Sequence, residues 1–457
     1  MQDINASPLL LYNGKMLMIK KILCYVGTFA AALLFLWGAL LLSSSVPDEK
    51  IYDNLYSSAQ HYSGKMAFGF KSDGRYNSVT DNYADVILLN IIYNIKSNDP
   101  FISSLDTKYY SGGEEGVNAG FYYSLTEGIP PDTDYTRYWH GMAVFIRPLL
   151  IFTDVEGIKN IGAWAVMLLM AALCVILTVK KQYFGAAAVI ISFSAVQLWN
   201  IRLSLEYLPS AAVCFFMSIL YVLLEKKSDD ILIYLSICGG VMIAFFDFLT
   251  AETLTILIPL LLVYIIRMND GRTGELKSMF RTFFLNCIAW GISYIMTFIA
   301  KWTIASAVTG ENKFTAALSS VGERFAGEAD KIGYPKLILY APLANLSTVF
   351  GGTERISSGN IIVGLAVTAV VMCGVYYILR RKVFCKEAVI FAVIAVIPFI
   401  RFSVLSNHSY LHEFFTYRAL ASSVMALLAF VWYNILLSEN KKTVSGNKKS
   451  IKYKESR

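Results

Sequence analysis

Long apolar runs separated by short polar connections dominate the chain. Several of these runs reach the roughly 20 residues that a helix needs to cross the hydrocarbon core of a bilayer. We expect membrane-spanning helices near residues 22–43, 160–179, 183–201, 207–224, 231–248, 253–266, 281–303, 359–379, 387–404 and 416–437. The pattern therefore predicts an all-α polytopic membrane protein with about ten transmembrane helices.

One further apolar stretch, Lys336–Phe350, is short and is interrupted by Pro342. A proline inside an apolar run of this length is typical of a re-entrant or interfacial segment rather than of a full span. We therefore leave it out of the count of transmembrane helices.

The composition agrees with a membrane protein and excludes several other classes. The chain has 457 residues, of which 56% are hydrophobic and 16% are charged, and its mean hydropathy is +0.52. A soluble chain of this length would carry about 25% charged residues. A water-soluble enzyme, a disordered protein and a disulfide scaffold are therefore excluded. Phosphate-binding glycine loops and the nucleophile elbow of serine hydrolases are also missing, which disfavours a nucleotide-driven pump and a serine hydrolase.

The distribution of basic residues orients the predicted bundle. If both termini are cytoplasmic, the inner segments carry 22 of the 40 Lys and Arg residues, as the positive-inside rule expects. Residues 1–21 are then a cytoplasmic N-terminal segment, 22–43 the first transmembrane helix, and 438–457 a basic cytoplasmic tail. The net charge of +7 follows this topology, so we expect a multi-pass protein of the cell membrane and no nucleic-acid partner.

A large first extracytoplasmic loop, residues 46–159, precedes the transmembrane bundle at 160–437. It holds 15 of the 33 carboxylates. Thr80 is placed to cap an amphipathic helix that reaches Asn90 and is apolar enough to lie on the membrane surface. A second amphipathic stretch follows at 138–152. A second outer loop is expected at 304–357.

The four histidines, His61, His140, His408 and His412, all fall on the predicted outer side. His408 and His412 are four residues apart, so a helix would place them on one face. Three interpretations stay open for this pair: a zinc site, an interfacial belt of aromatic residues, and the lining of a polar cavity. No third outer ligand is evident, so we assign no metal and no other cofactor, although a divalent metal is compatible with the chemistry.

Arginines recur at the predicted outer depth of the bundle and in the first loop. Their planar guanidinium groups suit phosphate, and a cation among lipid headgroups needs an anionic partner. Snorkelling of single arginines to the lipid headgroups is the simpler alternative. The candidate substrate-binding residues are Arg137, His140, Arg147, Asp247, Arg401, His408, His412 and Arg418.

Three carboxylates are candidates for a general base: Asp81, Asp85 and Asp48. Asp81 and Asp85 are one helical turn apart, a spacing at which one acid can raise the pKa of the other. They are equally typical of acids that complement a helix N-terminus. Asp247, among aromatic residues at the end of a span, is a candidate because an intramembrane acid is costly. Glu206, four residues after Arg202, is expected to form an ion pair with it.

The layout resembles the GT-C class of integral-membrane glycosyltransferases, including the protein O-mannosyltransferase and aminoarabinose transferase branches. Proteins of that class have a cytoplasmic N-terminus, one span, a large outer loop with amphipathic helices and about ten further spans, and most of this chain is similar to them in layout. The acidic pair that follows the first span in that class is matched by Asp48-Glu49, with Asp81 and Asp85 further on.

The resemblance implies transfer of a sugar, with inversion, from a polyprenyl-phosphate donor to an acceptor hydroxyl on a glycan, lipid or protein. It implies that an aspartate is the base, and that Arg418, with Arg401 or Arg137, holds the phosphate. Three other functions stay open: a transporter or flippase of lipid-linked saccharides, an O-antigen polymerase or ligase, and a non-enzymatic scaffold. Membrane lipids are partners in every case.

Overall fold

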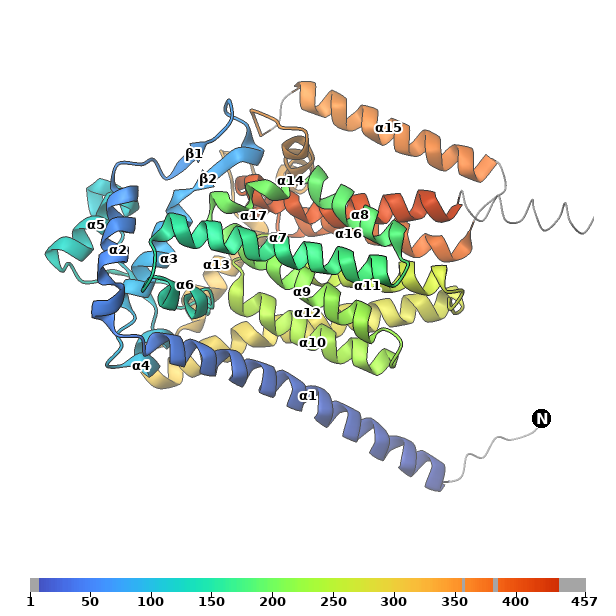
Figure 1. Ribbon diagram of the computed structural model, residues 1–457, viewed down its shortest axis with the longest axis horizontal. Coiled ribbons are helices and arrows are strands. Elements are labelled where there is room, and N and C mark those ends of the chain that lie inside the picture. Colours follow the sequence, from blue (N-terminus) through green and yellow to red (C-terminus); the bar gives the residue numbers. More distant parts are fainter. Residues whose placement is uncertain (1–7, 356–357, 381–384, 435–457) are drawn as a thin grey trace, which may run out of the picture.

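Figure 1 shows the computed structural model, which describes residues 8–355, 358–380 and 385–434. The predicted basic tail, 438–457, lies outside the described residues, as do the end of the last predicted span and the first seven residues. Seven helical segments are long and apolar enough to cross a membrane. They are Met18–Ser44, Val155–Val179, Leu205–Leu224, Asp229–Phe246, Leu276–Thr309, Lys386–Val404 and Glu413–Asn434.

These segments correspond to labelled helices of the bundle (Figure 1). They contain α1 (Pro8–Ser44), α7 (Val155–Val179), α9 (Leu208–Leu224), α10 (Asp229–Phe246), α12 (Leu276–Thr309) and α16 (Val389–Val404), and the last begins with α18 (Glu413–Thr416) and η6 (Tyr417–Ala419). The remaining predicted spans are helical with shorter apolar parts: α8 (Tyr183–Ala195), α11 (Leu254–Asn269) and Ile362–Gly374 of α15 (Ser358–Arg380). The chain is thus a helical, multi-pass membrane protein.

The short helix α11 is at the core of the bundle, where it packs mainly against α9. Every residue from Leu254 to Ile266 is buried. A helix that is apolar on all sides is typical of the interior of a large protein or of a membrane span, and in α11 the apolar residues are enclosed by other helices. By contrast, α1 and α15 lie along the periphery of the bundle (Figure 1) and expose Phe35, Leu42 and Val370, as lipid-facing helices do.

Residues 46–154 form a separate layer, here called the lobe, at the C-terminal end of α1 (Figure 1). Its elements are α2 (Asp48–Ser63), β1 (Phe68–Phe70), η1 (Tyr76–Ser78), β2 (Val79–Asp81), α3 (Asn82–Asn94), α4 (Pro100–Leu105), β3 (Lys108–Tyr109), η2 (Gly113–Glu115), α5 (Gly116–Glu127), β4 (Thr133–Asp134) and α6 (Ala143–Leu149). The strands β1 and β2 pair antiparallel, as do β3 and β4. Two small two-stranded antiparallel sheets therefore interrupt the predicted all-α fold.

The helix α3 corrects two expectations about this lobe. Its N-cap is Asp81 rather than Thr80, because Thr80 belongs to β2 and pairs with Gly69 of β1. The helix does not lie on a membrane surface either, since nine of its 13 residues are buried by α2, α5 and other parts of the protein. Its apolar pattern therefore reflects packing within the lobe. Within the second predicted stretch, 138–152, the helix α6 covers Ala143–Leu149 and contains Pro148.

Arg147 of α6 ties the lobe to the end of α1. Its guanidinium is fully buried and donates hydrogen bonds to the carbonyl oxygens of Ile92 (2.8 Å), Ile95 (2.9 Å) and Val46 (2.8 Å), and it forms an ion pair with Asp48. Val46 lies just after α1, Asp48 is the first residue of α2, and Ile92 and Ile95 lie at the end of α3. The two terminal nitrogens of Arg147 therefore already have partners inside the protein, which argues against its predicted substrate-binding role, while its Nε has no partner among the described residues.

Ion pairs gather at the opposite end of the bundle, where the helices are joined by short basic connections. They join Lys21 to Asp230 (2.7 Å), Arg267 to Asp229 (2.8 Å) and Arg272 to Glu225 (2.9 Å). These contacts connect the first turns of the first span with the α9–α10 and α11–α12 connections. The chain therefore has one end rich in basic connections and one end covered by the lobe.

The predicted second loop, 304–357, is largely helical. It contains the end of α12, then α13 (Phe314–Ala326) and α14 (Tyr334–Val349), with Pro342 inside α14. Both helices pack against α17 (Ser406–Leu411). On the other side, η3 (Leu198–Leu203) and η4 (Leu205–Tyr207) connect α8 to α9. These segments, together with the lobe, enclose the site described next.

Candidate active site

A cavity of about 130 Å³ lies where the lobe meets the bundle. Three of the four histidines line it, and we call it the histidine cavity. Its walls come from β1, β2 and α3 of the lobe, the segment before α6, η4, the α10–α11 connection, α13, α17 and the start of the last span. The lining residues are Phe68, Asp81, Tyr83, Ala84, Ile87, Leu88, Tyr135, Tyr138, His140, Glu206, Phe248, Arg324, His408, His412 and Phe415.

Of the three predicted bases, only Asp81 lines this cavity. It is 3% exposed, and its Oδ1 accepts a hydrogen bond from the Ala84 backbone N–H (2.9 Å), which closes the first turn of α3. Burial raises the pKa of Asp81 to about 7, and the negative charge of Asp85 adds to this increase. A carboxyl with such a pKa can accept a proton near neutral pH.

His408 and His412 line the cavity, as the polar-cavity interpretation of this pair expects, and His140 lies there with them. The His408 and His412 rings are 4.8 Å apart. His408 Nε2 is 3.0 Å from the Leu249 carbonyl oxygen, and His140 Nε2 is 2.9 Å from that of Tyr135. The Nδ1 atoms of His140 and His412 have no hydrogen-bond partner among the described residues.

Burial keeps these histidines neutral. It lowers the pKa of His140 and of His412 to about 3 and lowers the pKa of His408 well below its ordinary value. The neutral rings can therefore accept or donate hydrogen bonds to a ligand without adding positive charge. His61 lies apart from them, beside Glu156 (3.2 Å).

The zinc interpretation gains no support from the arrangement of ligands. Among the described residues, one group of three potential metal ligands comes close together, and it consists of Asp106, Asp134 and Glu311. The Lys313 ammonium lies between them, at 2.9, 2.6 and 2.7 Å. This cluster links the lobe to the α12–α13 connection and does not include the histidines.

Among the described residues, Arg324 of α13 is the one arginine that lines the cavity, and the sequence did not single it out. Its Nη1 donates to the Ser320 carbonyl oxygen (2.8 Å), while its Nε has no partner among the described residues. Its guanidinium is 5.8 Å from the centre of the Tyr138 ring. The amphipathic pattern of α13 was the available signal, but it gave no reason to prefer this arginine to others.

Glu206 is the second unpredicted residue of the cavity. The expected ion pair with Arg202 is wrong, because Arg202 is exposed and the structure, which describes both residues, places no ion pair between them. Glu206 is 8% exposed and lines the cavity. Its carboxylate has neither a hydrogen bond nor an ion pair with any other described residue.

Asp85 points away from the cavity into a saturated network. Its carboxylate accepts hydrogen bonds from Tyr62 Oη, Ser204 Oγ and the Leu205 N–H, each at 2.7 Å, and Lys159 Nζ lies at 3.6 Å. Burial raises its pKa, while Lys159 and the three hydrogen bonds oppose this change. Because its oxygens are occupied, the structure argues against Asp85 as the base.

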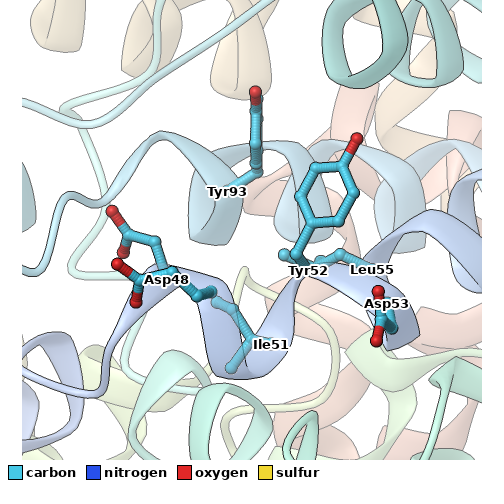
Figure 2. Close-up of a pocket in the computed structure, with 7 residues that line it drawn as sticks. Asp48, Ile51, Tyr52, Asp53, Leu55 and Tyr93 are labelled. Carbon is cyan, nitrogen blue, oxygen red and sulfur yellow. The ribbon is translucent and has the colours of Figure 1, made fainter.

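Asp48, the third predicted base, lies in a different pocket. That pocket has a volume of about 340 Å³ and is lined by α2 and by Tyr93 of α3. Figure 2 shows the Asp48 carboxylate at one end of this pocket, with Asp53 at the other and the Tyr52 and Tyr93 rings above them. Since Asp48 pairs with Arg147, the structure does not bring it to the histidine cavity.

Two of the other predicted ligand-binding residues have internal partners. The Arg401 guanidinium binds Glu252 (Nε to Oε1, 2.8 Å) and the Leu249 carbonyl oxygen (2.7 Å). Asp247 accepts a hydrogen bond from the backbone N–H of Thr250 (2.9 Å). Neither residue lines the cavity. They hold the α10–α11 connection in place instead of facing a ligand.

Arg137 and Arg418 lie against aromatic rings near the cavity. The Arg137 guanidinium is 3.9 Å from the centre of the Tyr135 ring, and that of Arg418 is 4.2 Å from the centre of the Tyr207 ring. Among the described residues, neither forms an ion pair with a carboxylate, and the Nε atoms of both are without a partner. Both remain candidates for contact with an anion, although neither lines the cavity itself.

Comparisons of the chain with protein-family models, with curated proteins and with solved structures give no match.

Proposed function

We propose that this chain is an integral-membrane glycosyltransferase that works at the histidine cavity. Its donor would be a polyprenyl-phosphate sugar, and its acceptor a hydroxyl group on a glycan, lipid or protein. The observation that carries the proposal is Asp81, a buried carboxyl with a pKa of about 7 in a cavity that also holds neutral histidines and a cation. A base of this kind suits proton transfer from a hydroxyl at neutral pH.

The chemistry needs few groups. Asp81 takes the acceptor's hydroxyl proton while the hydroxyl oxygen forms a bond with the anomeric carbon of the sugar. The bond between that carbon and the phosphate oxygen breaks, and its electron pair leaves on the phosphate, which gives inversion. Arg324 stabilises the charge that develops on the phosphate, a role that positive groups perform best in a site with little water.

The cation assignment differs from the one that the resemblance implied. Arg401 is neutralised by Glu252, so we replace it with Arg324, which lines the cavity. Arg137 is a second candidate, because its guanidinium lies against Tyr135, a ring of the cavity wall. The neutral histidines would bind the hydroxyl groups of donor or acceptor.

A sugar requires the cavity to open. Its volume of about 130 Å³ is below the roughly 300 Å³ at which ligand pockets begin. The helix α13 is the wall best placed to move, because Ala317 is its only buried residue among those described. We therefore infer that α13, which carries Arg324, shifts when the donor enters.

The proposed topology places the cavity on the extracytoplasmic side, as a lipid-linked donor requires. The basic connections at the opposite end of the bundle support this orientation through the positive-inside rule. Both termini would then be cytoplasmic, and the donor's lipid chain would lie against the peripheral helices in the cell membrane.

The test is transfer from radiolabelled polyprenyl-phosphate sugars by the full-length protein in lipid vesicles that contain membrane-derived acceptors. We expect labelled product from the unmodified protein and at least about a hundredfold less from Asp81→Asn, because the base is lost. Asn caps a helix as well as Asp does, so the fold should persist.

The matched control is Asp48→Asn, which removes a carboxylate from the other pocket and should leave transfer unchanged. Equal transfer by Asp81→Asn and the unmodified protein would overturn the assignment of the base. Movement of the intact donor across the vesicle membrane without transfer would instead identify a flippase.

A further inference from the structure

The histidine cavity contains two carboxyl groups, and the proposed transfer uses one of them. Glu206 is more than nine-tenths buried, lines the cavity, and has no hydrogen-bond donor or cation in contact with its carboxylate among the described residues. Leaving a polar group buried without a partner costs free energy. Such a group at a cavity wall therefore points to a ligand that supplies the missing contact.

Asp81 also has a carboxylate oxygen without a hydrogen-bond partner among the described residues. One of its oxygens accepts the Ala84 N–H, and within the described part of the chain no donor reaches the other. Both carboxyls therefore present free oxygen atoms to the same small cavity.

Asp85 fixes these two carboxyls relative to each other. It lies one turn after Asp81 on α3, and its Oδ1 accepts hydrogen bonds from Ser204 Oγ and the Leu205 N–H. Those groups immediately precede Glu206 in the chain. The other oxygen is held by Tyr62 Oη, so Asp85 cannot turn freely. The segment that carries Glu206 is thereby fastened to the helix that carries Asp81.

We propose that Asp81 and Glu206 act as a pair that shares one proton and binds the hydroxyl groups of the substrate. Asp85 is the positioning residue that holds the two carboxyls relative to each other. This inference rests on the proposed function. The ionised member of the pair accepts the hydroxyl proton, and the protonated member donates a hydrogen bond to a second oxygen of the substrate.

The electrostatics of the cavity support a shared proton. Two carboxylates in one water-poor site repel each other, so one of them remains protonated. Burial, together with the negative charge of Asp85, raises the pKa of Asp81 to about 7, so Asp81 is able to carry the proton of the pair up to that pH. The titratable and charged groups that surround the pair are Asp85 and Tyr83 of α3, Tyr135, Arg137, Tyr138 and His140 before α6, Lys159 of α7, Tyr207 of η4, Asp247 after α10, Arg324 of α13, His408 and His412 at α17, and Arg418 of η6.

Arg324 is the only cation among the cavity-lining residues of the described chain. The histidines beside it are neutral, and Lys159 is engaged with Asp85 and Glu156. One guanidinium can balance one carboxylate. This charge count favours a pair with a single negative charge over a pair with two.

The test uses dicyclohexylcarbodiimide, which modifies protonated carboxyls in apolar surroundings, on the full-length protein in detergent from pH 5 to 9. Mass spectrometry then locates the modified residue. In the unmodified protein we expect labelling at Asp81 or Glu206 that persists to about pH 7. In Glu206→Gln, the labelling midpoint of Asp81 should fall by about one pH unit or more, because its like-charged neighbour is gone.

The reciprocal variant, Asp81→Asn, should lower the labelling midpoint of Glu206 in the same way, so either variant alone suffices if the other does not fold. Asp85→Asn should weaken the coupling, while Asp48→Asn should change nothing. Unchanged midpoints in both single variants would overturn the shared proton. Labelling needs no donor, so coupled midpoints in a protein without transfer activity would retain the pair and reject the proposed function.

Discussion

Replacing Arg147 with Met should lower the free energy of unfolding by about 3–5 kcal/mol, as removal of one partner from a buried, hydrogen-bonded ion pair does. Met has similar length but no donors. The carbonyl oxygens of Val46, Ile92 and Ile95 would lose their hydrogen bonds inside the protein, and Asp48 would lose its cation. The loss of stability is measured by heating the protein with a fluorescent maleimide, which reacts with the buried thiols of Cys214 and Cys385 only when the protein unfolds.

The matched control for this prediction is Asp48→Asn. The Asp48 side chain is 41% exposed, so its ion pair is partly screened by water and its removal should cost only about 1 kcal/mol. If the two variants lost equal stability, the three carbonyl contacts would not matter and the ion pair would account for the whole effect. A smaller loss in Arg147→Lys than in Arg147→Met would show that charge alone replaces part of the network.

The predicted spans agree with the observed helices because a span is recognised from the average hydropathy of about 20 residues, so that no single residue decides the prediction. Each of the ten predicted segments contains helix, and where they differ from it the cause is local. The span at 183–201 ends early at Ala195, because Gln197 adopts a left-handed backbone conformation with φ of 48° and the chain continues as η3. A single residue of this kind is invisible to an average over a window.

The pairing of charges could not be predicted in the same way. Arg401 and Glu252 are 149 residues apart, and only the folded bundle shows that they neutralise each other. The sequence predicted an anionic partner for an arginine at this depth, but it could not distinguish an internal carboxylate such as Glu252 from a substrate phosphate. The same reasoning applies to Arg147 and Asp48.

The two aspartates of α3 show how local geometry decides between equal candidates. From their spacing alone, Asp81 and Asp85 would be equivalent acids on one face of the same helix. In the structure Asp81 precedes the helix as its N-cap, so its side chain faces the cavity while that of Asp85 reaches Ser204. All four histidines fall on the predicted outer side, and three of them, His140, His408 and His412, line the same cavity.

The buried carboxyl of Asp81 should also make stability depend on pH. Between its ordinary pKa of 3.8 and its pKa of about 7 in the fold, the folded protein holds a proton at Asp81 that the unfolded chain releases. Stability therefore falls as pH rises through this window. At pH 8 Asp81→Asn, which carries no charge, should be more stable than the unmodified protein by up to about 4 kcal/mol.

The comparison must be made between the two proteins at each pH, because the histidines act in the opposite direction. His140 and His412 stay neutral in the fold down to about pH 3, whereas the unfolded chain protonates them below about pH 6.5, so their contribution raises stability as pH rises. These terms cancel in the difference between Asp81→Asn and the unmodified protein. The difference in the free energy of unfolding between the two proteins should be near zero at pH 4 and reach its full value by pH 8. It is measured by the same reaction of buried thiols with maleimide during heating. A difference that is constant across this range would mean that Asp81 is ionised in the fold at all these pH values, and therefore that it is too well hydrated to serve as a base near neutrality.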